Sequence, residues 1–369
     1  QTKATLERNA GNINDFANSI RAMRRHEIER IGLAWMSGVI DDEASLAGMT
    51  DVYDAAIEAS LQWAIQHRIN DIQIDEAPAA IAIIGMGRYG GREVNFSSDA
   101  DVIIIYRPAE GADDDQANLF ARKVQEDLRA ILQGPTTFEP KIELDMDLRP
   151  EGKNGPLVRS YASCEEYYRS WASTWEHQAL LRARYAAGDA SLAEDFLMNI
   201  ADPLRYPKID LTETQIAEIR KLKARMEAER LPRGVRRDRH LKLGKGGLSD
   251  VEWTIQLLQL QHAGDNANLR VNGTLQALNE LEHRKLISAG DAVVLRKAWR
   301  MCTAARNGSY LWSGRVNQAD ILPDDSYSLG GIAVYLGYDA NRGQHFENDL
   351  LAVIRKARDV TERLFYGRS

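Results

Sequence analysis

Apolar residues in the first part of the chain recur at the spacing of amphipathic helices. Phe16, Ile20 and Met23 share one helical face, and β-branched runs are few over residues 4–75. Helix-forming residues dominate again after Pro156 and continue to the last residue. We therefore expect helical regions in both terminal parts of the sequence.

The pattern between these two regions is that of strands. Apolar runs at 81–84 and 102–106 predict two buried strands, and residues 142–148 alternate strictly between apolar and acidic side chains. Between the second and third runs, residues 116–132 have the period of an amphipathic helix. The middle of the chain is thus expected to fold as a small α/β segment.

Together these patterns predict an α+β protein that is mostly α-helical. Its expected parts are an N-terminal helical segment (1–75), a small α/β domain (76–160) and a C-terminal helical bundle (161–369).

Composition and charge narrow the class of protein. The chain has 369 residues, 44% of them apolar and 27% charged, which suffices for two or three folding units. It has no apolar run long enough to cross a membrane, and its two cysteines, Cys164 and Cys302, are far apart. We therefore expect a cytoplasmic protein without a disulfide framework or a membrane partner. The net charge of −7 argues against binding to nucleic acid.

A glycine-rich turn follows the first predicted strand. Gly85, Gly87 and Gly90 have the spacing of the dinucleotide-binding fingerprint. That fold needs a full crossover helix before the next strand, and an acidic residue about 20 positions further on, at the end of that strand. Here only residues 91–101 precede the next strand, and the acidic residues stand at its start. The nicotinamide interpretation therefore fails on spacing.

Acidic residues beside this turn suggest a different chemistry. Asp99 and Asp101 are two positions apart at a strand entrance, so both side chains project from one face. Asp145 lies in the alternating run, and two neighbouring strands would bring the three carboxylates together. Mg²⁺ neutralises such a cluster and takes its other ligands from water and substrate phosphates. The glycine turn lets backbone N–H groups approach those phosphates. The pattern favours two-metal nucleotidyl transfer.

The Asp-x-Asp pair alone has a simpler interpretation. Charged residues at a strand edge also form plain turns or prevent pairing between sheet edges. The glycine turn before the pair and the third acidic position after it make the metal-site interpretation the stronger one.

Longer stretches around these residues resemble one family of enzymes. The matching stretches are 85–93, 98–101, 145–158, 174–184 and 243–253. They are similar to DNA-polymerase-β-like nucleotidyltransferases and, more narrowly, to glutamine-synthetase adenylyltransferases, also called glutamate-ammonia-ligase adenylyltransferases. The resemblance implies a polymerase-β-like nucleotidyltransferase fold for the α/β domain, flanked by helical regions.

The resemblance also implies an activity. Enzymes of this family carry two such domains: an N-terminal copy removes AMP from glutamine synthetase by phosphorolysis, and a C-terminal copy attaches AMP from ATP. The stretch 174–184 and the final 362–367 resemble the C-terminal copy. We therefore expect the adenylylating half, which transfers AMP from ATP to a tyrosine hydroxyl of glutamine synthetase, releases pyrophosphate and so lowers the synthetase's activity in nitrogen control.

The resemblance assigns the metal ligands and catalytic residues to Asp99, Asp101 and Asp145, with Mg²⁺ as the cofactor. Asp147 stands where many members of the family have Arg, so it stays open whether Asp147 also faces the metal.

The residues expected to bind ATP are Gly85, Gly87, Arg88, Ser98, Arg149 and Lys242. Three of these assignments have alternatives. Arg88 could equally be a surface residue, Arg149 could pair with Glu151 or solvent, and Lys245 could take the place of Lys242.

Two other functions stay open at this point. One is the phosphorolytic removal of AMP, and the other is a regulatory module that binds nucleotide and signal proteins without turnover. A PII-type signal protein is a further partner that only the family resemblance implies.

Overall fold

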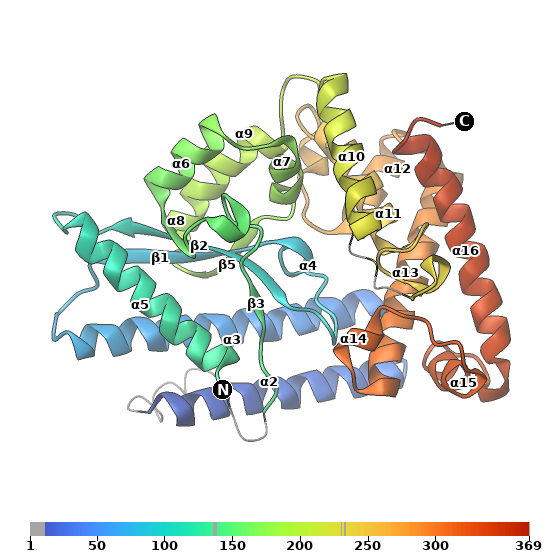
Figure 1. Cartoon of the computed structure of the whole chain (residues 1–369), viewed down its shortest axis with the longest axis horizontal. Coiled ribbons are helices and arrows are strands. Elements are labelled where there is room, and N and C mark those ends of the chain that lie inside the picture. The colour runs from blue at the N-terminus through green and yellow to red at the C-terminus, as the bar shows by residue number, and fades with distance from the viewer. Residues whose placement is uncertain (1–11, 136–138, 230, 232–233, 369) are drawn as a thin grey trace. The chain divides into compact units, whose positions relative to one another are not determined.

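The computed structural model describes residues 12–135, 139–229, 231 and 234–368 (Figure 1). It consists of two compact units, residues 1–205 and 206–369. Helices predominate and a small mixed sheet lies in the first unit, which confirms the predicted α+β, mostly helical fold class.

The first unit contains a five-stranded sheet and helices that precede, interrupt and follow it. Its elements are α2 (Ile13–Met36), α3 (Asp42–Asp71), β1 (Ala79–Gly85), α4 (Gly87–Gly90), β2 (Ala100–Pro108), α5 (Asp114–Gln133), β3 (Leu144–Asp145), the 3₁₀ turn η1 (Gly152–Asn154), β4 (Val158–Ser160), α6 (Tyr161–Ser170), α7 (Thr174–Leu180), β5 (Arg184–Gly188), α8 (Ala190–Asp195), the π-helical η2 (Phe196–Ala201) and α9 (Asp202–Arg205).

Side-chain caps and one buried ion pair fix the long helices of this unit. The Asn12 side chain accepts the Asn14 N–H at the start of α2, and Asp41 accepts the Ala44 N–H at the start of α3. Arg68 of α3 donates to both carboxylate oxygens of Asp127 of α5, each at 2.6 Å. This bidentate contact joins the predicted N-terminal helices to the helix between the strands.

The sheet has the strand order β3-β2-β1-β5, and β4 also pairs with β2. β1 is antiparallel to β2 and β5, whereas β3 and β4 are both parallel to β2. β3 pairs near the start of β2 and β4 further along it, so the intervening loop, residues 146–157, leaves the sheet and returns to it.

Two details of the predicted strands are wrong. The third strand is confined to Leu144–Asp145 instead of 142–148. Residues after 156 are not all helical, because β4 and β5 return to the sheet.

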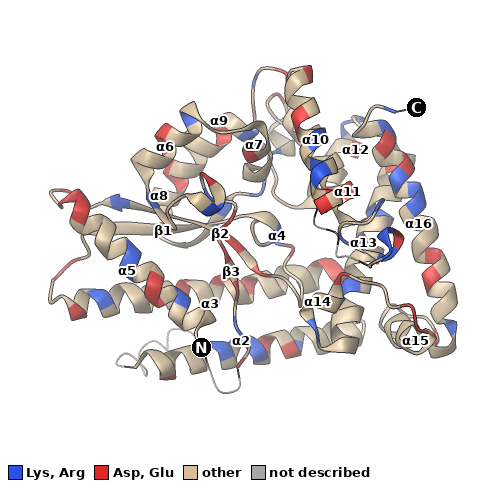
Figure 2. Cartoon of the chain, viewed as in Figure 1, with Lys and Arg blue, Asp and Glu red and all other residues tan. Residues whose placement is uncertain are grey.

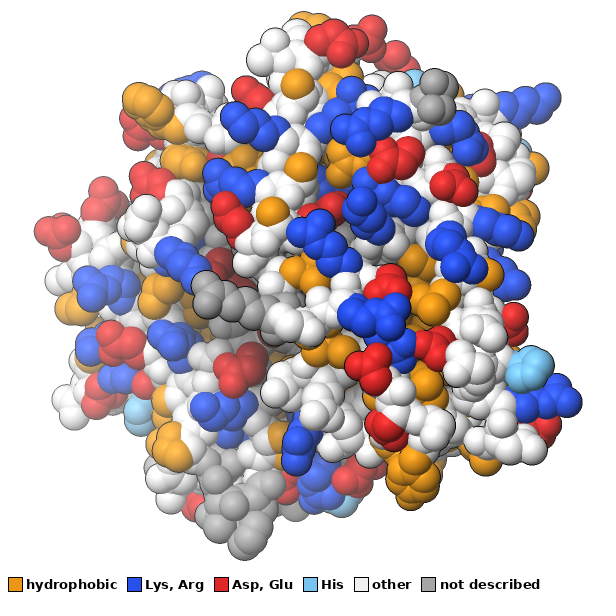
Figure 3. All heavy atoms as spheres, turned by 45° about the vertical axis from the view of Figure 1, so that its right-hand side comes forward, with side chains coloured by type: hydrophobic (Ala, Val, Ile, Leu, Met, Phe, Trp, Pro, Cys, Tyr) orange, Lys and Arg blue, Asp and Glu red, His pale blue; other side chains and the backbone are white. Residues whose placement is uncertain are grey.

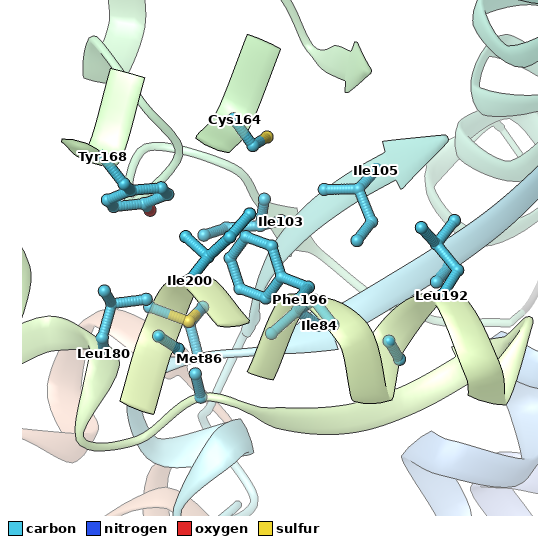
Figure 4. Packing of buried hydrophobic residues seen from close by; sticks show 14 residues of the cluster. Ile84, Met86, Ile103, Ile105, Cys164, Tyr168, Leu180, Leu192, Phe196 and Ile200 are labelled. Atoms are coloured by element: carbon cyan, nitrogen blue, oxygen red, sulfur yellow. The ribbon is translucent and has the colours of Figure 1, made fainter. Parts of the chain in front are cut away.

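A buried apolar cluster covers one face of the sheet (Figure 4). Ile84 of β1 and Ile103 of β2 are register partners, and Phe196 of η2 and Tyr168 of α6 pack over this face. The opposite face is in contact with α3 and α5. Helices after residue 160 thus belong to the core of the first unit; the predicted boundaries at 75/76 and 160/161 stay predictions.

The described part of the second unit is built from helices joined by loops, with one isolated β-bridge between His240 and Ile321. Its elements are α10 (Glu213–Glu229), η3 (Arg237–Arg239), α11 (Leu248–His262), η4 (Ala267–Leu269), α12 (Thr274–His283), α13 (Ala289–Ser313), α14 (Val316–Ala319), α15 (Ser326–Tyr335), η5 (Ala340–Arg342) and α16 (Gly343–Leu364). Trp299 on α13 and Phe346 on α16 are among its largest fully buried side chains.

The surface carries charges of both signs. On the face shown in Figure 3, Lys and Arg side chains are interspersed with Asp and Glu, in keeping with 47 basic and 54 acidic residues in the sequence. No helix in the described ranges combines the length and apolar character needed to cross a bilayer.

Candidate active site

The register between β2 and β3 places two of the predicted carboxylates side by side. Asp101 and Asp145 are partners in this parallel pair, and the Ala100 N–H donates to the Glu143 carbonyl at 2.8 Å to hold the register. Asp99 stands just before β2, two residues from Asp101, and is exposed. The strands therefore place Asp101 beside Asp145, with Asp99 two residues before Asp101, and the predicted joint role of the three stays a prediction.

The glycine turn lies against Asp101. The Met86 N–H donates to the Asp101 carbonyl at 2.8 Å, which fixes the turn to the start of β2. Gly87 has a φ of +51°, and a Cβ atom built there would lie 2.1 Å from Asp101 Oδ2. Only glycine fits at this position, because any side chain would displace the carboxylate.

The other predicted glycine, Gly85, has a packing role in this structure. A Cβ atom at Gly85 would lie 3.2 Å from the ring of buried Tyr89, which closes the back of the turn. Burial raises the pKa of the Tyr89 hydroxyl well above its ordinary value, so this ring stays neutral. Backbone contact of Gly85 and Gly87 with ATP stays a prediction.

Ser98 and Arg88 are engaged by the protein around the turn. The Ser98 hydroxyl donates to Asn95 Oδ1 at 2.7 Å, and its carbonyl accepts the Tyr53 hydroxyl at 3.0 Å. Arg24 of α2 donates to the Tyr53 oxygen at 2.8 Å. Arg88 Nε donates to the Glu93 carbonyl at 3.2 Å. Binding of ATP by Ser98 and Arg88 stays a prediction. In this structure the contacts of Ser98 and Arg88 stabilise the backbone that precedes Asp99.

The segment after β3 turns away from the sheet at Asp147. The Asp147 N–H donates to Asp145 Oδ1 at 2.7 Å, which closes a local turn and ends the strand. Asp147 is exposed, and its carboxylate pairs with Lys153 Nζ at 3.3 Å. Sequence alternation could not reveal this turn, because an Asp side chain competes with a strand for the backbone N–H groups.

Arg149 is buried and holds the loop that follows. Its guanidinium donates to the carbonyls of Met146 at 2.7 Å and Gly155 at 2.9 Å, with longer bonds to Lys153 and Pro156. The acidic neighbour of its guanidinium is Asp147, at 3.9 Å, where the sequence suggested Glu151. Binding of ATP by Arg149 stays a prediction. In this conformation the side chain stabilises the backbone of residues 146–157 through hydrogen bonds.

A cleft of about 580 Å³, which we call the carboxylate cleft, opens beside β3. Its lining includes Asp99, Asp145, Asp147, Arg149, Lys153 and Arg129. Arg129 comes from the polar face of α5, and sequence reasoning missed it. The sequence did offer one indication of Arg129, because α5 comes between β2 and β3 along the chain, and these are the strands that carry the acidic residues.

The three carboxylates suit Mg²⁺ in chemistry, but their side chains do not converge on one point in this conformation. Across the ranges that the structure describes, no three His, Cys, Asp or Glu side chains are arranged to hold a metal ion. One cause is visible, since Asp145 Oδ1 is occupied by the Asp147 N–H. Carboxylate oxygens are the type of donor that this ion prefers. The metal assignment stays a prediction.

Two arginines near the turn are held by acidic residues that the sequence did not indicate. Buried Arg182 contacts Glu93 at 3.4 Å, and Arg184 Nη2 donates to Asp54 of α3 at 2.8 Å. A Cβ atom at Gly90 would lie 2.0 Å from the Arg182 carbonyl, so this glycine permits the close approach. The Arg182–Glu93 and Arg184–Asp54 contacts thus stabilise the segments next to the glycine turn.

Lys242, the remaining residue expected at ATP, belongs to the second unit. Its carbonyl accepts the Ser249 N–H at 2.9 Å, and its charge contributes to lowering the pKa of Asp320, after the larger influence of Arg306 and against the effect of burial. The assignment of Lys242 or Lys245 to ATP stays a prediction.

A comparison with known families decides which of the resemblances holds. The model of the family described as glutamate-ammonia ligase adenylyltransferase matches residues 1–199, more than half of the chain. The chain belongs to this adenylyltransferase family. Residues 219–365 match a second model, described as GlnD PII-uridylyltransferase. Membership in a family of nucleotidyltransferases confirms the predicted enzyme class.

Curated relatives in this adenylyltransferase family match all or nearly all of the chain. A bifunctional glutamine synthetase adenylyltransferase/adenylyl-removing enzyme from Bifidobacterium longum (strain NCC 2705) is 78% identical over 100% of the chain and 34% of the relative. The enzyme of the same name from Mycobacterium tuberculosis (strain ATCC 25618 / H37Rv) is 44% identical over 94% of the chain and 34% of the relative.

The chain therefore spans about a third of the length of the relatives it matches. These matches do not uphold the predicted assignment to the C-terminal, adenylylating copy, and we withdraw it. The relatives' name covers both attachment and removal of AMP, so similarity alone leaves the direction of transfer undecided.

Proposed function

We propose that this chain transfers AMP between ATP and a tyrosine hydroxyl of glutamine synthetase, in the direction of attachment, with release of pyrophosphate. The observation that carries the proposal is the register of Asp101 with Asp145 beside Gly87, whose missing side chain leaves room for the Asp101 carboxylate. The names of the relatives support glutamine synthetase as the protein substrate.

The residues divide the work of this reaction. Mg²⁺ would be held by Asp99, Asp101 and Asp145. When bound, it would neutralise charge on the phosphates and lower the pKa of the attacking hydroxyl. The glycine turn presents backbone N–H groups to the triphosphate on the Asp101 side. The Asp145 carboxylate, on the neighbouring strand, orients the hydroxyl. The tyrosine hydroxyl releases its proton to solvent, its oxygen bonds to the α-phosphorus, the bond from that phosphorus to the bridging oxygen breaks, and pyrophosphate leaves.

Phosphorolytic removal of AMP is the second candidate, because the name of the relatives includes an adenylyl-removing activity. The same carboxylates would serve it, with phosphate as the nucleophile and ADP as the product. The carboxylates and the names of the relatives fit both directions, so the transfer assay described next decides between them.

Two further points belong to this proposal. The match of residues 219–365 to a PII-uridylyltransferase supports a PII-type signal protein as a regulatory partner. Buried Cys164 and Cys302 are both free thiols, which supports the cytoplasm as the place of action.

A transfer assay tests the proposal. The chain is incubated with Mg²⁺, ATP labelled at the α-phosphate and unmodified glutamine synthetase, and in parallel with adenylylated synthetase and phosphate. Label on the synthetase supports attachment, and release of ADP without labelling would replace it with removal. Tight binding of ATP with no labelled synthetase and no ADP would instead indicate a regulatory module that binds nucleotide without turnover.

Asp99→Asn is the diagnostic variant in this assay, and Asp147→Asn is its matched control. Both remove one charge from the carboxylate cleft, but Asp147 already pairs with Lys153. We expect about 10²-fold or greater loss of transfer in Asp99→Asn and nearly full activity in Asp147→Asn. Undiminished transfer in Asp99→Asn would refute the assigned site.

A further inference from the structure

A second cleft, of about 730 Å³, runs along α5 and adjoins the carboxylate cleft. Arg129 and Leu157 line both of them. We call this second space the α5 cleft; Arg122, Gln125 and Pro156 are among its other lining residues. The proposed reaction assigns no role to it.

The α5 cleft contains an amide that lacks a partner. Gln125 is 4% exposed, and its Nε2 atom has no hydrogen-bond acceptor among the residues that the structure describes. A buried donor without a partner is unfavourable, so an acceptor supplied by a bound molecule would be favourable here. Gln125 lines the α5 cleft, so a molecule bound there is the proposed source of that acceptor.

The rim of the cleft is basic. Arg122 and Arg129 are exposed on α5, where Figure 2 shows basic bands between acidic ones. The acidic lining residue Glu126 pairs with Lys123 at 2.8 Å, which offsets its charge. The cleft thus offers two cationic groups and one amide donor to oxygen atoms of a ligand.

The position of the cleft indicates which reactant enters it. Gly87 and its turn flank Asp101, whereas the carboxylate cleft opens beside Asp145 on β3. In phosphoryl-type transfer the attacking and leaving oxygens are roughly in line, so the acceptor arrives on the side away from the triphosphate. That side leads past Arg129 and Leu157 into the α5 cleft.

We infer that the α5 cleft binds the segment of the protein substrate that carries the acceptor hydroxyl, an extended polypeptide with an acidic side chain close to that residue. The inference rests on the proposed function. A backbone carbonyl of the segment accepts from Gln125, the acidic side chain pairs with Arg122, and Arg129 guides the chain toward Asp145.

Steady-state kinetics with intact glutamine synthetase test this inference. Arg122→Glu reverses an exposed charge and does not threaten the core. We expect the KM for the synthetase to rise about tenfold, with the KM for ATP and the kcat nearly unchanged, since the lost contact is made equally before and during transfer. Arg169→Glu on α6, also an exposed arginine but outside the clefts, is the matched control and is expected to leave both KM values unchanged.

Gln125→Met provides an independent variant, because it keeps the length of the side chain and removes the donor. The KM for the synthetase is expected to rise several-fold, with a thermal midpoint no lower than that of the unaltered chain. An unchanged KM for the synthetase in both Arg122→Glu and Gln125→Met would overturn the inference. If the unaltered chain transfers no AMP at all, the proposed function itself has failed, which is a different result.

Discussion

The closest approach between the glycine turn and the carboxylates is made by Gly87 and Asp101. The φ of Gly87 is +51°, and the space where its Cβ would lie is taken by Asp101 Oδ2. The glycine thus has two separate reasons to be there, backbone conformation and room for a carboxylate. The second reason ties it to the site and can be separated from the first by experiment.

Gly87→Ala is predicted to lower the rate of AMP transfer by about 10²-fold, because the new methyl group displaces the Asp101 carboxylate. Gly111→Ala is the control, since Gly111 has a φ of +76° but nothing within 4 Å of its would-be Cβ. Both variants carry the cost of a positive φ, and only the first disturbs the site. Equal effects of the two substitutions on transfer would contradict this account.

Residue spacing was enough to place Asp99, Asp101 and Asp145 near the starts of neighbouring strands, but their side chains form no three-carboxylate metal group in the described residues. It was not enough for Tyr53, whose hydroxyl bonds the Ser98 carbonyl from α3. That contact joins residues 45 positions apart, and nothing in the local sequence around either residue indicates it.

At the scale of elements, the loop between β3 and β4 is the part on which the site depends most. It begins directly after Asp145, lines the carboxylate cleft and is held by the buried guanidinium of Arg149. Without the Arg149 side chain, the loop would keep only its short-range backbone hydrogen bonds, and Asp145 at its start would be held less firmly.

Arg149→Ala is predicted to speed hydrogen exchange over residues 146–157 by at least about tenfold, because several buried carbonyls lose a charged donor. The transfer rate should fall in parallel. Lys153→Ala removes a neighbouring cation that is 80% exposed at its side chain and pairs with Asp147. Hydrogen exchange in Lys153→Ala should match that of the unaltered chain. If exchange over residues 146–157 accelerates as much in Lys153→Ala as in Arg149→Ala, the loss of a positive charge explains the effect and the hydrogen bonds of Arg149 do not.

Elements were predictable where their pattern was long. The helix expected at 116–132 is found as α5 (Asp114–Gln133), and both apolar runs are strands. β4 (Val158–Ser160) and β5 (Arg184–Gly188) were missed because neither contains the continuous run of branched apolar residues that marks β1 and β2. Their place in the sheet comes from pairing with β2 and β1, which is a tertiary property.

At the scale of the whole molecule, both units have buried apolar residues, and the second also has a group of buried charges among three helices. The first has the apolar cluster over its sheet, whereas α10, α11 and α16 of the second meet around buried charges. Lys223 of α10 pairs with Asp250 of α11, and Arg358 Nη1 of α16 donates to the same carboxylate at 2.9 Å. The Gly246 N–H adds a further bond to Asp250 at 2.6 Å.

Lys223→Met is predicted to destabilise the second unit by about 3–5 kcal/mol, because it leaves Asp250 buried with one partner fewer. Hydrogen exchange should rise in α10, α11 and α16 and stay unchanged in β1 and β2. Arg225→Met on the same helix removes a cation that is 68% exposed at its side chain. It is expected to cost less than about 1 kcal/mol.

The same cluster gives the stability a pH dependence. Burial opposes the charge of Asp250, but Lys223 and Arg358 outweigh it and lower the pKa of the carboxyl below its ordinary 3.8. The stabilisation is therefore present above that value and is lost as the pH falls through the lower folded pKa. Urea unfolding of the second unit should show a free energy that drops below pH 4, and this drop should be smaller in Asp250→Asn.

The central claim is that Asp99, Asp101 and Asp145 converge on a divalent cation beside the nucleotide. A crystal structure of the chain with Mn²⁺ and a non-hydrolysable ATP analogue tests it most directly, because the anomalous signal of the ion locates it without reference to the ligand. The account predicts an ion bounded by all three carboxylates, with Asp145 released from the Asp147 N–H and the triphosphate against the Gly87 turn. An ion and nucleotide bound elsewhere, with the three carboxylates still apart, would contradict it.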